Sequence, residues 1–148
     1  MCIFTGMKII PFVVLLVLIG RGCKDEVADI NQATLKYQVH SRGFYRDVLV
    51  ANKEVLVSGL NGVNLKTETI DDATWKAFQK AFADLNAEEM HHLKAPSNQR
   101  LYDGAAIAKL GVTYKGKSFE SIDFDHGTPP AEIEKLVNLM AAYVNREE

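Results

Sequence analysis

The spacing of apolar residues changes along the chain, and this change constrains the fold more than any other feature of the sequence. Between residues 34 and 70, apolar side chains largely alternate with polar ones, as in "LKYQV" at 35–39. A repeat of two is typical of half-buried β-strands, and "SRG", "ANK" and "LNG" supply turn residues between the segments. We therefore predict a meander of strands over 34–40, 44–50, 54–59 and 63–70, the last at a sheet edge.

After residue 70 the repeat becomes helical. Trp75, Phe78, Phe82 and Leu85 fall at positions i, i+3, i+7 and i+10, which places them on one face of a helix. Asp71 precedes this stripe and is a good N-cap residue. The sequence thus predicts an amphipathic helix over about 72–85 whose aromatic face enters the core.

The last third of the chain repeats the same order of strand and helix. Residues 105–114 alternate, "KG" at 115–116 predicts a turn, and 117–124 predicts a returning strand. Phe119 and Ile122 are three positions apart, so placing both inside requires an extra residue, and we expect a β-bulge near Glu120–Ser121.

A second helix follows this hairpin. Thr128 is its predicted N-cap and Pro129 its first residue, where no N–H group is missed. Its apolar stripe contains Ile133, Leu136, Val137, Met140 and Val144. Short connections favour an α+β fold, with an antiparallel sheet of about five strands and two amphipathic helices on one face.

The N-terminal segment has the character of an export signal. Lys8 precedes an apolar run from Ile9 to Ile19, which is too short to span a membrane as a helix. The segment ending at "GRGCKDE" resembles a bacterial lipoprotein signal, and this resemblance implies cleavage before Cys23 and lipidation of its thiol. We therefore divide the chain into a signal peptide (1–22), a lipidated cysteine with a polar tether (23–33) and one domain (34–148).

Composition narrows the possible partners. Cleavage would leave 126 of the 148 residues, with 15 of the 17 basic and all 19 acidic residues, and Cys23 as the sole cysteine. Such a mildly acidic chain, without a basic patch, argues against a nucleic-acid partner, and no internal disulfide can form. The expected membrane contact is the lipid on Cys23, in the outer membrane. "CKDE" resembles a tag for export to the cell surface; without such export the domain would face the periplasm.

Three motifs, "SRGFY", "RLYDGAA" and "FDHGTPP", occur in this order across residues 34–145. As a set they resemble small lipoproteins of Bacteroidota. The resemblance implies the fold and the envelope location, and it implies no activity, substrate or cofactor.

Two groups of polar residues are candidate sites. Asp123, Asp125 and His126 lie at a strand end, where two outward carboxylates and an imidazole would suit a divalent metal or acid–base chemistry. The alternative is that Asp125 and His126 bond the turn backbone.

The second candidate is the long loop 95–104, because loops of this length are often functional. Its Arg100, Tyr102 and Asp103, together with the similar set Arg42, Phe44 and Tyr45, are candidate ligand-binding residues. The alternative is that Arg100 and Tyr102 seal the sheet edge.

The sequence contains no phosphate-binding glycine loop, no Gly-x-Ser-x-Gly elbow and no His-Glu-x-x-His motif. We therefore expect a non-catalytic module without a cofactor that binds a protein or glycan. The alternative is an inhibitor of an envelope-attacking hydrolase, such as a protease or lysozyme. A metal-dependent enzyme using Asp123, Asp125 and His126 is the remote alternative.

Overall fold

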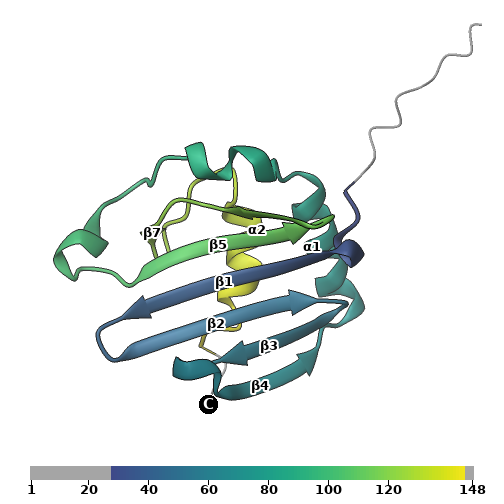
Figure 1. Cartoon of the computed structure of the whole chain (residues 1–148), viewed down its shortest axis with the longest axis horizontal. Helices are drawn as coiled ribbons and strands as arrows, with labels where there is room; N and C mark the ends of the chain where they lie inside the picture. Colours follow the sequence, from purple (N-terminus) through teal and green to yellow (C-terminus); the bar gives the residue numbers. More distant parts are fainter. Residues whose placement is uncertain (1–27, 146–148) are drawn as a thin grey trace, which may run out of the picture.

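One antiparallel sheet forms the centre of the molecule (Figure 1). The computed structural model describes residues 28–145. The strand order is β4-β3-β2-β1-β5-β6, and β7 also pairs with β5. The strands are β1 (Ala33–Ser41), β2 (Phe44–Ala51), β3 (Glu54–Ser58), β4 (Asn64–Thr69), β5 (Ile107–Tyr114), β6 (Lys117–Glu120) and β7 (Phe124–Asp125).

The two α-helices of the described chain lie behind this sheet in Figure 1. They are α1 (Asp72–Ala83) and α2 (Glu134–Ala141), accompanied by the short 3₁₀ helices η1 (Ile30–Gln32), η2 (Leu60–Gly62), η3 (Ala87–His92) and η4 (Gln99–Tyr102). The predicted α+β fold is confirmed. The sheet has seven strands rather than about five: all six predicted strand segments are present, and the returning segment is split into β6 and β7.

The central strand β1 shows why the sheet has one covered and one open face. Leu35, Tyr37 and Val39 are fully buried, whereas Lys36 and Gln38 between them are partly exposed. The β1 strand pairs with both β2 and β5 and runs from η1 to the tight β1–β2 turn. The predicted alternation is therefore confirmed, with its apolar side facing the helices.

Helix α1 begins as predicted. The Asp71 side chain accepts a hydrogen bond from the Thr74 backbone N–H at 2.8 Å, which caps the first turn. Trp75, Phe78 and Phe82 are buried in the common core. The aromatic stripe is thus the face that packs onto the sheet.

Helix α2 begins later than the sequence predicts. Its first residue is Glu134, and Ile133 occupies the N-cap position. Thr128 forms a β-bridge with Asp125 instead of capping the helix, and Pro129 lies in the connection after it. The predicted cap at Thr128 is wrong because Gly127, at φ +91°, turns the chain back onto β7 before the helix can start.

The predicted irregularity after β6 is present. Gly111 of β5 lies opposite Glu120, whereas Ala108 lies opposite Phe124. Three residues, 121–123, therefore lie opposite two residues of β5. The extra residue expected near Glu120–Ser121 is confirmed, and it separates β6 from β7.

The start of the domain also differs from the predicted boundary. Ile30 is buried in the core, so η1 belongs to the folded unit rather than to a polar tether ending at residue 33. Cys23 and the segment 1–22 lie outside the described residues. Within residues 28–145, no helix is long and apolar enough to cross a membrane.

Candidate functional site

A single buried carboxylate fixes the loop 97–104 to the sheet. Asp125 of β7 is only 2% exposed. Its oxygens accept hydrogen bonds from the Ser97 hydroxyl at 2.5 Å and from the backbone N–H groups of Gln99 and Arg100 at 2.8 and 3.0 Å. Because those N–H groups open η4, Asp125 caps this short helix from a distant strand.

Arg100 completes the Asp125 cluster. Its guanidinium forms an ion pair with the Asp125 carboxylate at 3.1 Å and donates a hydrogen bond to the Ser97 carbonyl oxygen at 2.7 Å. Burial alone would raise the pKa of Asp125. The hydrogen bonds from the Ser97 hydroxyl, from the Arg100 and Gln99 N–H groups and from the Arg100 guanidinium overcome this effect and lower it to about 2. Asp125 is therefore ionised near neutral pH, and Arg100 balances its charge.

This arrangement corrects the predicted position of Asp125, which does not point outward into solvent. As strand alternation requires, Asp125 lies opposite Ile107 on the other face from Phe124, but residues 97–100 fold over it. Arg100 is correspondingly a residue that holds the loop.

The predicted metal site of Asp123, Asp125 and His126 is not formed. The Asp125 oxygens are occupied by protein donors, and the Asp123 side chain, 52% exposed, pairs with Lys109 at 3.4 Å. The Nδ1 atom of His126 lies 2.8 Å from the Tyr37 hydroxyl. Across residues 28–145, no cluster of three or more His, Cys, Asp and Glu residues suits a metal ion.

His126 and Tyr37 instead connect β7 to the central strand. Tyr37 is fully buried, and burial raises its pKa, while burial lowers the pKa of His126. Both groups therefore favour their neutral forms and share one hydrogen bond. This bond positions β7 and, with it, the neighbouring Asp125.

The tip of the fixed loop is apolar and exposed. Leu101 is 69% exposed and Tyr102 is 73% exposed, although both lie within η4. Asp103 then adopts a left-handed conformation at φ +58°, and the Gly104 N–H donates to the Gln99 carbonyl oxygen at 2.8 Å. The loop thus presents two apolar side chains on a turn that is closed by its own backbone hydrogen bond and is held to Asp125 at Gln99 and Arg100.

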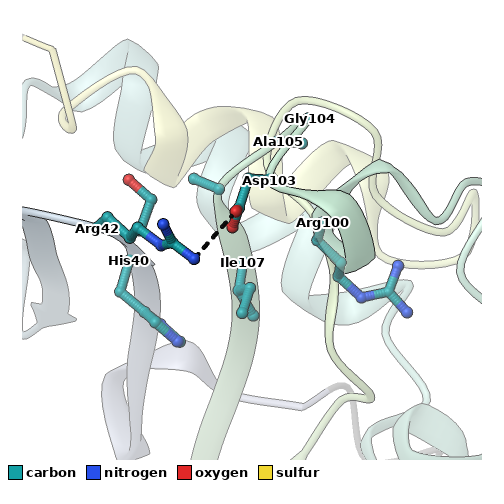
Figure 2. Close-up of a pocket in the computed structure, with 9 residues that line it drawn as sticks. His40, Arg42, Arg100, Asp103, Gly104, Ala105 and Ile107 are labelled. Carbon is teal, nitrogen blue, oxygen red and sulfur yellow. Dashed lines mark ion pairs between the residues drawn. The ribbon is translucent and has the colours of Figure 1, made fainter.

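A groove lies beside this tip, between the β1–β2 turn and the start of β5. Its volume is ≈ 680 Å³, within the range of ligand pockets. Figure 2 shows Arg42 and Asp103 facing each other with an ion pair of 3.3 Å, while the Arg100 side chain points away from them. The other lining residues are His40, Ser41, Gly104, Ala105, Ala106 and Ile107.

Three of the six predicted ligand-binding residues, Arg42, Arg100 and Asp103, therefore line one groove. Phe44 and Tyr45 are the β2 partners of the lining residues Ser41 and His40, but neither lines the groove, and as adjacent strand residues they point to opposite faces. The Arg46 guanidinium lies 4.9 Å from the Phe44 ring centroid, and the Tyr45 hydroxyl donates to Asp47 at 3.2 Å. The predicted aromatic surface of Phe44, Tyr45 and Tyr102 is therefore not one patch.

Sequence reasoning missed two features of this site. It missed Asp125 as the residue that fixes the loop, because β7 and residues 97–100 are far apart in the sequence and nothing local indicates their contact. It also missed Leu101, although an apolar residue beside tyrosine in a glycine-terminated loop is a detectable signal. No family model, curated protein or solved structure matches this chain.

Proposed function

We propose that this chain is a non-catalytic lipoprotein of the bacterial cell envelope that binds a partner protein through the 97–104 loop. The observation that supports this proposal is the exposed pair Leu101 and Tyr102 on a backbone fixed by Asp125. A loop ordered before binding loses less conformational entropy on association. Tyrosine is also enriched among residues that dominate binding energies.

The surroundings of the tip fit this role. Arg42 and Asp103 form an exposed ion pair beside the apolar side chains. Protein interfaces commonly have an apolar centre and a polar rim. A glycan is the second ligand class, because the exposed Tyr102 ring offers a flat surface on which a sugar ring can stack.

The double variant Leu101→Ala, Tyr102→Ala tests the proposed contact. Loss of both side chains is expected to weaken partner binding by at least about tenfold, because tyrosine is enriched among the residues that dominate binding energies and full burial of a leucine side chain contributes about 1.5–3 kcal/mol. The measurement is crosslinking of the full chain in living cells, followed by mass spectrometry of the captured partners. The variant is expected to keep its unfolding midpoint, because both side chains are exposed.

The matched control is Leu60→Ala, since Leu60 in η2 is 65% exposed and distant in sequence from the tip. Capture should be unchanged in this variant. If the double variant retains every partner, the tip is not the binding surface. Glycan-array binding lost in the same variant would identify a sugar rather than a protein.

The fixed, protruding loop also favours a second function, inhibition of a hydrolase that attacks the envelope. The tip is a 3₁₀ turn rather than an extended segment, so it would fill a pocket instead of pairing with an enzyme as a substrate strand does. Purified protein added to lysozyme and protease assays tests this function. Inhibition that disappears with Leu101→Ala, Tyr102→Ala would support it.

Anchoring is tested separately through Cys23. We expect labelled palmitate to be incorporated into the wild-type chain and lost in Cys23→Ala, which should move from the membrane to the soluble fraction. Equal labelling of both would contradict lipidation at this residue. Protease treatment of intact cells then distinguishes the two faces, because only a surface-exposed domain is digested before the outer membrane is broken.

A further inference from the structure

A second groove lies between α1 and α2, away from the residues of the proposed binding loop. Its volume is ≈ 510 Å³, and both helices contribute to its walls. The Lys135 Nζ atom at the start of α2 lies 3.6 Å from the carboxylate of Asp84, the C-cap residue of α1, so the start of α2 lies beside the end of α1.

The groove exists because small residues occupy facing positions on the two helices. Ala77 and Ala81 on α1 and Ala142 after α2 leave room that larger side chains would fill, and Leu139 adds an apolar wall. Thr74 and Ala81 are about two helical turns apart, which corresponds to roughly 10 Å. The groove is therefore an open, mainly apolar channel along the two helices.

Charge is concentrated at one end of this channel. Lys80 in the last turn of α1 and Lys135 in the first turn of α2 both line it, and Asp84 is the carboxylate paired with Lys135. The two lining lysines and the Asp84 carboxylate together carry a net positive charge, and Glu134 in the same turn of α2 does not line the groove. The opposite end is lined by Thr74, Ala142 and Tyr143, whose side chains carry no formal charge at neutral pH.

We propose that this groove binds a single-chain amphiphile with an anionic head, such as a medium-chain fatty acid. Its carboxylate lies between Lys80 and Lys135, and its hydrocarbon chain lies along Ala77, Ala81 and Leu139. Burial of the chain removes apolar surface from water, which supplies most of the affinity. The lysines set the orientation and the preference for an anion.

The test is calorimetric titration of the full chain with sodium decanoate below its micelle concentration. We expect saturable binding of one molecule per chain. Methyl decanoate, which lacks the charge, should bind roughly fivefold more weakly, because exposed ion pairs contribute modestly.

Two sets of variants locate the site. Ala77→Leu with Ala142→Leu fills the channel with good helix-forming residues and should reduce binding at least about tenfold. The matched control is Ala83→Leu, an exposed alanine of α1 outside the groove. Lys80→Glu with Lys135→Glu should reverse the preference for decanoate over its ester, whereas Lys76→Glu, outside the groove, should leave it unchanged.

Several results would overturn the proposal. One is a decanoate titration without a saturable heat of binding. Another is decanoate binding by the folded Ala77→Leu, Ala142→Leu variant that equals that of the wild-type chain. A third is an unchanged preference for decanoate over its ester in the charge-reversed variant. Capture of the chain by anionic phospholipid vesicles without any binding of decanoate would also overturn it, because the groove would then contact a bilayer surface. Circular dichroism confirms that each variant is folded, and the charge-reversed pair tests the site even if the filled variant unfolds.

Discussion

Asp125→Asn is expected to release the 97–104 loop while leaving the sheet folded. The carboxylate accepts hydrogen bonds from Ser97, Gln99 and Arg100, whereas an amide offers one acceptor oxygen and turns an NH₂ group toward these donors. Arg100 also loses its balancing charge. Amide hydrogen exchange at Gln99 and Arg100 should accelerate by about tenfold to a hundredfold, as measured by NMR.

The same variant should weaken partner capture, although it leaves Leu101 and Tyr102 unchanged. The matched control is Asp123→Asn, because Asp123 is half exposed and its ion pair with Lys109 lies outside the loop.

A fall in pH should release the loop as the Asp125→Asn substitution does, because it protonates the Asp125 carboxylate. The pKa of Asp125 is lowered to about 2, so its contribution to stability is present above pH ~4 and is lost as the pH falls toward 2. Unchanged exchange at Gln99 would show that other contacts hold the loop.

Trp75→Ala is expected to destabilise the whole domain by about 3–5 kcal/mol, because truncation of a buried aromatic side chain leaves a cavity. Trp75 is 7% exposed, and its ring centroid lies 6.2 Å from that of Phe78. Both side chains belong to the core between α1 and the sheet. The measurement is the urea midpoint of unfolding, which should fall clearly with an unchanged slope.

Lys76→Ala is the matched control for this substitution, since Lys76 is exposed one position further along the same helix. Its midpoint should change by less than about 0.5 kcal/mol in free energy. A Trp75→Ala protein with the wild-type midpoint would mean that the aromatic stripe contributes little to the core.

The fold was largely predictable because its signals are local. Alternation in β1, the cap at Asp71 and the turn at residues 115–116 each depend on neighbouring residues, and the structure contains all three. The start of α2 was not predictable in this way. Thr128 has the chemistry of a cap, but its bridge to Asp125 competes, and that bridge depends on how Gly127 turns the chain.

In the candidate site, too, the features that depend on neighbouring residues were predictable and those that depend on distant contacts were not. Arg42 and Asp103 form an ion pair in the folded chain. The sequence indicates the two residues only separately. The role of Asp125 depends on its contact with Ser97, which lies 28 positions earlier in the sequence. No local sequence pattern indicates such a contact. Alternation correctly assigned Asp125 to the face opposite Phe124, but it carries no information about a loop that covers that face.

The direction of β1 has a consequence for how this domain would be displayed. The strand has nine residues, which corresponds to about 30 Å, and it separates the N-terminal η1 from His40, Ser41 and the groove. A chain held at its N-terminus would therefore carry the Leu101–Tyr102 tip at the end remote from its support (Figure 1). Attachment through a lipid, or through an N-terminal tag on a sensor chip, would leave this end accessible to a large partner.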